Sequence, residues 1–89
     1  MARFDFETID GAVSGGRPLS ADVYFDLGLS CSTGRHGSVD LVAAHKWFNL
    51  AVLSGNEDAK TYREEIAREL SRDDMMRALK AAREWQALH

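Results

Sequence analysis

The sequence predicts an all-α protein of about four helices, of which the first two form an αα-hairpin. From Ser20 onward, apolar residues recur at spacings of three and four, which is the period of an amphipathic helix. Glycine and helix-capping residues separate these runs, and the one proline, Pro18, precedes the first of them. A chain of 89 residues is long enough for one modest core. We therefore expect a single domain over residues 19–89.

Residues 1–18 differ in character from the rest of the chain. "MARFDFETID" alternates Phe4 and Phe6 with acidic residues, and "GAVSGGRP" has the composition of a flexible linker. The alternation fits a short edge strand or an extended docking segment, and a partly ordered tail fits it equally well. We expect a flexible N-terminal arm whose two phenylalanines contact a partner.

The first predicted helix begins after Ser20, a suitable N-cap, and ends near Gly34, where two nearby glycines permit left-handed backbone geometry. Small residues on its inward face allow another helix to approach closely. The residues predicted to form that face are Ala21, Phe25, Gly28 and Ser32.

The second predicted helix is capped by Asp40 and ends at Ser54-Gly55, so it runs antiparallel to the first. Its predicted inward face consists of Ala44, Trp47, Phe48 and Ala51.

Two further helices are expected over about 57–70 and 72–88. Asn56 is a natural N-cap for the third helix, and Ser71 with Asp74 approximates a capping box for the fourth. The predicted apolar stripes are Ala59, Tyr62, Ile66 and Leu70 in the third helix and Met75, Ala78, Leu79, Ala82 and Trp85 in the fourth.

The segment from about 21 to 59 has an ordered pattern, A-x-x-x-x-x-L-G, then G-R, D, A-x-K-W-F and A-x-x-x-G-N-x-x-A. This pattern resembles the Sel-one-like repeat (SLR) family, a relative of the tetratricopeptide repeats. The matching residues are Ala21, Leu27, Gly28, Gly34, Arg35, Asp40, Ala44, Lys46, Trp47, Phe48, Ala51, Gly55, Asn56 and Ala59.

The resemblance implies a single-repeat, small bacterial protein that acts as an adaptor or regulator in signalling, cell-cycle or assembly control. Two departures from the family pattern occur: Cys31 replaces a usual aromatic residue, and the loop reads Arg35-His36-Gly37-Ser38. A lone repeat cannot bury both of its faces, so we expect the last two helices to cap it. An alternative is a structural homo-oligomer, such as a homodimer, joined through the open repeat face.

Bulk composition limits the classes of partner. The net charge is −3 with acidic and basic residues interleaved, which argues against binding to nucleic acid or to a membrane surface. A single cysteine suits a reducing compartment, and no apolar run approaches the length of a membrane span. We therefore expect a cytoplasmic protein whose partner is another protein or a peptide.

Cys31, His36 and His45 are the candidate metal-ligating or nucleophilic residues of the sequence. Their spacing, C-x4-H-x8-H, lacks the tight ligand pairs and the fourth ligand of a zinc site. A Cys/His nucleophile pair would also need an orienting group and an oxyanion cradle, so a buried structural thiol is the better interpretation. We expect no enzyme activity, no catalytic residue, no metal and no cofactor.

The remaining candidates form a predicted partner-binding surface, in which His45 faces solvent on the outer side of its helix. Trp85 has two open interpretations, a core residue or an exposed binding anchor. The predicted partner-binding residues are Phe4, Phe6, Tyr24, Arg35, His36, His45 and Trp85.

Overall fold

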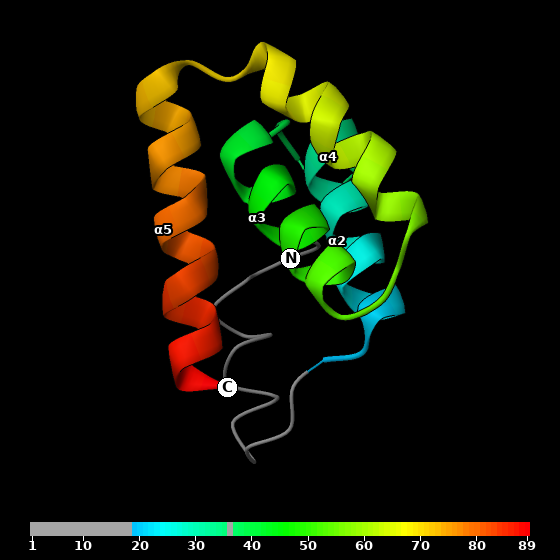
Figure 1. The fold of residues 1–89 in the computed structure, drawn as a ribbon. Helices are drawn as coiled ribbons and strands as arrows, with labels where there is room; N and C mark the ends of the chain where they lie inside the picture. Colours follow the sequence, from blue (N-terminus) through cyan, green and yellow to red (C-terminus); the bar gives the residue numbers. More distant parts are fainter. Residues whose placement is uncertain (1–18, 36) are drawn as a thin grey trace.

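The computed structural model describes residues 19–35 and 37–89, which form four helices and no strand (Figure 1). The helices are α2 (Ala21–Thr33), α3 (Leu41–Leu53), α4 (Asp58–Glu69) and α5 (Arg72–Leu88). The predicted all-α class is therefore confirmed, and each helix runs roughly opposite to the one before it. None of the helices in the described part of the chain is long and apolar enough to cross a membrane. The arm predicted over residues 1–18 lies outside the described residues.

Side-chain caps define where three of the helices begin, as the sequence predicted. In each case the capping oxygen accepts a hydrogen bond from the backbone amide three residues further on, which satisfies an N–H group that the helix itself leaves unpaired. The capping pairs are Ser20 Oγ with Val23 N (3.2 Å), Asp40 Oδ1 with Ala43 N (3.0 Å) and Ser71 Oγ with Asp74 N (3.1 Å).

The remaining boundaries also follow from local chemistry. α2 ends at Gly34, which has a φ of 72° and donates its amide to the carbonyl oxygen of Ser30. This left-handed geometry suits glycine because other residues have a Cβ that clashes there. α4 spans Asp58–Glu69, one residue shorter at each end than the predicted range of about 57–70, although Glu57 already has helical backbone angles. Asn56 still caps the helix, because its Oδ1 accepts from the amide of Ala59 at 3.1 Å.

α3 is the central helix of the fold and packs against α2, α4 and α5 (Figure 1). Its predicted inward face is confirmed, since Ala44, Trp47, Phe48 and Ala51 are fully buried. α4 and α5 lie on different sides of α3 rather than pairing with each other, so the last helix folds back onto the hairpin.

The close approach of α2 to α3 depends on Gly28. A Cβ at this position would lie 2.6 Å from the ring of Phe48, which is shorter than any ordinary contact. The absence of a side chain at Gly28 thus makes room for the ring of Phe48.

The inward face of α2 was predicted correctly only at Gly28. The buried positions are Tyr24, Leu27, Gly28, Ser30 and Cys31, whereas Ala21, Phe25 and Ser32 are only half-buried. The reason is that the helix turns Gly28 toward Phe48, which directs Phe25 toward Tyr62 of α4. The predicted stripes of the later helices hold at Ala59, Ile66, Ala78, Ala82 and Trp85, but Tyr62 (40% exposed) and Leu79 (37%) reach solvent.

Candidate functional site

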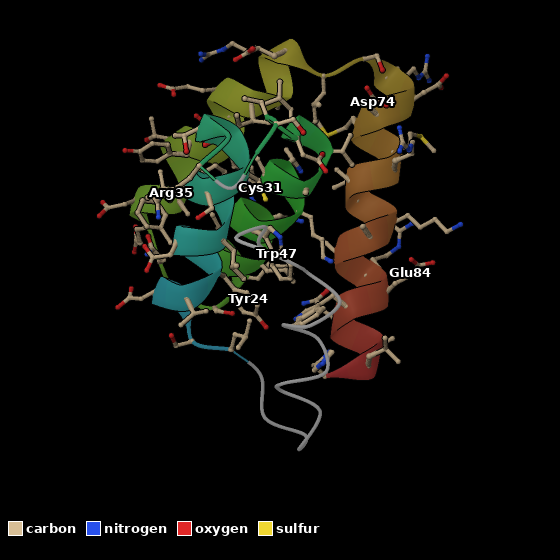
Figure 2. The ribbon with its side chains drawn as sticks, turned by 180° about the vertical axis from the view of Figure 1, so that it is seen from behind. Tyr24, Cys31, Arg35, Trp47, Asp74 and Glu84 are labelled. Carbon is tan, nitrogen blue, oxygen red and sulfur yellow. The ribbon has the colours of Figure 1, made fainter. Side chains whose placement is uncertain are left out.

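The structure separates the predicted partner-binding residues into three groups. Phe4, Phe6 and His36 lie outside the described residues. Arg35 is exposed in the loop after α2 (Figure 2). The other three are buried, with exposed fractions of 3% for Tyr24, 4% for His45 and 3% for Trp85.

Tyr24 and Trp85 belong to the core, so the expectation that they form a surface is wrong. The indole Nε1 of Trp85 donates to the hydroxyl of Tyr24 at 2.9 Å, in a buried contact. Trp47 packs against both side chains. Its ring stacks on that of Tyr24 at 5.9 Å between centroids and meets that of Trp85 edge-on at 5.0 Å. This aromatic cluster joins α2, α3 and α5, and it resolves the two interpretations of Trp85 in favour of the core.

A cation and a terminal imidazole extend the aromatic cluster. The Lys46 Nζ lies 4.2 Å from the centroid of the Trp47 ring and 5.1 Å from that of Trp85, within the range of a cation–π interaction. The ring of His89 stacks on Trp85 with centroids 3.9 Å apart. The Lys46 contact with Trp85 joins α3 to α5, whereas the His89 stack lies within the end of α5.

His45 was expected to face solvent, and this prediction is wrong because α4 covers it. Burial lowers the pKa of His45 below its usual value of 6.5, and the nearby positive charge of Arg63 lowers it further. Arg63 itself donates to Asn49 Oδ1 at 2.9 Å. The Nδ1 atom of His45 finds no hydrogen-bond partner among the residues that the structure describes. The imidazole is therefore held in its neutral form within the α3/α4 interface.

Cys31 is buried in the core, as predicted for a structural thiol. Burial raises the pKa of its thiol to about 12, and the negative charge of Asp40 contributes in the same direction. Because the nucleophile is the thiolate, Cys31 is a poor nucleophile at neutral pH. Over residues 19–35 and 37–89, no group of three His, Cys, Asp or Glu side chains is arranged to hold a metal ion.

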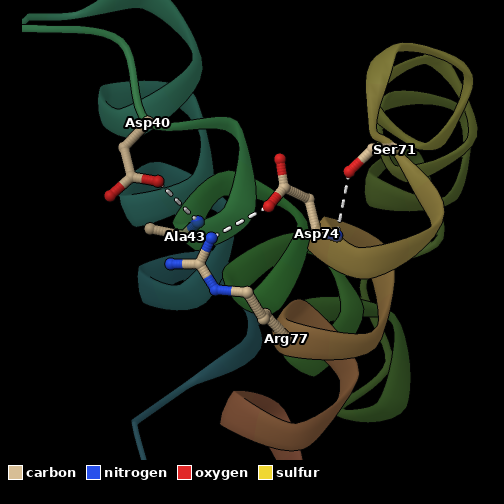
Figure 3. A network of polar contacts seen from close by, with 5 residues as sticks. All are labelled: Asp40, Ala43, Ser71, Asp74 and Arg77. Carbon is tan, nitrogen blue, oxygen red and sulfur yellow. Dashed lines mark hydrogen bonds and ion pairs between the residues drawn. The ribbon is translucent and has the colours of Figure 1, made fainter.

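The loop before α3 is tied into the helix that follows it. The amide of Asp40 donates to the carbonyl oxygen of Cys31 at 2.9 Å, and its carboxylate caps Ala43 (Figure 3). The carboxylate thus occupies the N-terminus of α3 and gives that end a negative charge. The loop functions in the structure as a connector between two helices.

A surface that the sequence patterns did not reveal lies where Asp22 and Phe25 of α2 meet Asn56, which caps α4, and Tyr62 of α4. Tyr62 is 40% exposed, yet its ring contacts Phe25 of α2 and Phe48 of α3, each at 5.3 Å between centroids. We name this surface the α2/α4 face and define it by the exposed side chains of Asp22, Asp58, Tyr62, Glu65 and Glu69.

The α2/α4 face is acidic along its whole length. Asp22 Oδ1 accepts from Asn56 Nδ2 at 3.4 Å, which places the start of α2 beside the start of α4. α2 carries no Lys or Arg. In α4, the spacing of 4, 3 and 4 residues from Asp58 through Tyr62 and Glu65 to Glu69 keeps these residues on one side of the helix. That spacing was the available signal, but Tyr62 was predicted to belong to the apolar stripe with Ala59, Ile66 and Leu70.

Comparison with known protein families, curated proteins and solved structures gives no match. The resemblance to the SLR family therefore stays a prediction that rests on the matching residues alone.

Proposed function

We propose that this chain is a non-enzymatic protein-interaction module, an adaptor or regulator that docks a protein or peptide through the α2/α4 face. The observation that carries the proposal is the position of Tyr62. Two ring contacts fix its side chain while two fifths of it stays exposed. A rigid aromatic side chain of this kind loses little entropy when a partner covers it, which is typical of binding hot spots.

The state of the nucleophilic and basic groups supports a non-enzymatic role. The thiol of Cys31 is protonated and the imidazole of His45 is buried, so neither is presented to a substrate. Arg35 remains part of the proposed binding surface, because it is exposed at the end of the α2/α3 hairpin. A bacterial setting in signalling, cell-cycle or assembly control is proposed on the SLR resemblance.

Affinity capture with matched variants tests this proposal. We expect a tagged Tyr62→Ala chain to lose the partners of the parent chain, and Tyr62→Phe to keep them because the ring remains. Leu88→Ala is the control, since it truncates a side chain that is 76% exposed but lies outside the α2/α4 face.

If Tyr62→Ala loses helical content, unfolding alone would explain a loss of partners. Glu65→Lys therefore serves as a second variant, because the Glu65 side chain is exposed. If both variants stay folded by circular dichroism and capture the same partners as the parent at the same yield, the α2/α4 face is not the binding surface.

A further inference from the structure

α5 carries a surface whose chemistry is the opposite of the α2/α4 face. Three cations and two apolar side chains lie on one side of the helix, and all five are exposed, with Met76 at 63% and Leu79 at 37%. We name this surface the α5 stripe; its members are Arg72, Met76, Leu79, Lys80 and Arg83.

The acidic residues of α5 lie at one border of this stripe or opposite it. Glu84 is four residues after Lys80, and Asp73 is seven residues before it, so both carboxylates lie on the Lys80 side of the stripe. Asp74 lies on the opposite side of the helix and pairs with Arg77 at 2.9 Å (Figure 3). The α5 stripe is therefore basic and partly apolar, with carboxylates at one border and none among its five members.

The two surfaces match in spacing as well as in charge. In α4, Asp58 and Glu69 flank Tyr62 and are eleven residues apart; in α5, Arg72 and Arg83 flank the apolar pair and are also eleven apart. At a rise of about 1.5 Å per residue, both spans are roughly 16 Å long. Carboxylates at the two ends of one helix can therefore meet guanidinium groups at the two ends of the other, with apolar side chains in contact between them.

These two surfaces cannot pair within one molecule. α4 and α5 are joined by Leu70 and Ser71 alone, and they lie on different sides of α3 (Figure 1). Like faces also repel each other, which disfavours a symmetric dimer through either surface.

From this match we infer that the α5 stripe of one copy docks on the α2/α4 face of a second copy. The inference rests on the proposed function, because it names an occupant for the same face. Joined reciprocally about a two-fold axis, the two surfaces close the dimer; joined head-to-tail, they leave one surface of each kind open on every dimer. In the head-to-tail arrangement further copies add to give longer assemblies or a closed ring. Because the contacts are exposed ion pairs around a small apolar centre, the association is weak and falls as salt is added.

Neutralising variants test the two surfaces separately. In sedimentation velocity at low salt, we expect the average mass of the wild-type chain to rise with concentration. Lys80→Gln/Arg83→Gln removes charge from the α5 stripe, and Asp58→Asn/Glu65→Gln removes it from the α2/α4 face. Each double variant should dissociate at a concentration about tenfold higher than the wild type does. Lys60→Gln/Arg77→Gln is the matched control, because it removes two exposed cations outside the stripe, and it should associate as the wild type does.

A mixture of the two double variants gives the decisive result. Each retains one intact surface, so we expect an equimolar mixture to form dimers and nothing larger. Folding of every variant is verified by circular dichroism. The inference is overturned if the wild type stays monomeric at about 1 mM, if neither double variant differs from the control, or if the mixture does not dimerise. A monomeric wild type that still captures a partner through Tyr62 would overturn this inference and leave the proposed function standing.

Discussion

The indole of Trp85 donates a buried hydrogen bond of 2.9 Å to the hydroxyl of Tyr24, 61 residues earlier in the chain. This contact links the first and last helices that the structure describes. Burial of both side chains makes the hydrogen bond important, because a buried donor without an acceptor is costly.

Tyr24→Phe is therefore expected to reduce the free energy of unfolding by about 1–3 kcal/mol, since it leaves the Trp85 N–H buried without its acceptor. Urea denaturation followed by tryptophan fluorescence measures this change. Tyr62→Phe is the control, because it removes a hydroxyl from a side chain that is 40% exposed. An equal effect of the two substitutions would show that the Tyr24–Trp85 bond contributes nothing of its own.

Gly28→Ala is expected to destabilise the fold although alanine is the better helix former. The added Cβ would lie 2.6 Å from the Phe48 ring, which is fully buried. Overpacking costs about 1–3 kcal/mol, against roughly 1 kcal/mol gained in helix propensity. Thermal unfolding measures the net effect. Introducing Phe48→Leu as well should recover part of the loss, and a more stable Gly28→Ala single variant would contradict the packing described here.

Lowering the pH is expected to destabilise the protein through His45. Folding lowers the pKa of this imidazole below 6.5, so the unfolded chain takes up a proton at a higher pH than the folded chain does. The contribution of neutral His45 to the free energy of unfolding is complete above pH 6.5. It is lost as the pH falls through the lower pKa that His45 has in the folded state.

His45→Leu should therefore flatten the dependence of the unfolding free energy on pH between about 7 and 5. His89→Gln is the control, since it removes a histidine from the end of the chain instead of the α3/α4 interface. A parallel pH dependence in His45→Leu and the wild type would refute this role.

The thiol of Cys31 is expected to be unreactive in the folded protein. Its pKa of about 12 leaves almost no thiolate at neutral pH, and the side chain is buried. Labelling with a chromogenic disulfide reagent should be slow without denaturant and rapid in concentrated urea. Rapid labelling of the native chain would reopen the question of a reactive cysteine.

Local features of the fold could be predicted from the sequence because they depend on neighbouring residues. Ser20, Asp40 and Ser71 cap amides only three residues away, and Gly34 supplies a backbone conformation that few other residues adopt. The buried face of α3 was also predictable, since apolar residues surround most of that helix.

The burial of Tyr24 and His45 could not be predicted in the same way. Tyr24 is buried because α5 returns to α3 and presents Trp85 to its hydroxyl. His45 is buried because α4 packs over a side of α3 that sequence periodicity assigned to solvent. Both outcomes depend on where a distant helix docks, and the spacing of residues within one helix does not encode that. The exposure of Tyr62 was not predicted for the same reason, because Tyr62 lies at the edge of the apolar stripe of α4.

Docking of the α5 stripe of one copy on the α2/α4 face of a second copy is the central claim, and a titration followed by nuclear magnetic resonance tests it most directly. Isotope-labelled chain at low concentration is mixed with increasing unlabelled chain at low salt. We predict progressive amide shifts at Tyr62 and Glu65 on one surface and at Met76 and Lys80 on the other, with core amides such as that of Ala51 unchanged. A spectrum that does not change over the titration, or shifts confined to residues outside these two surfaces, would contradict the account.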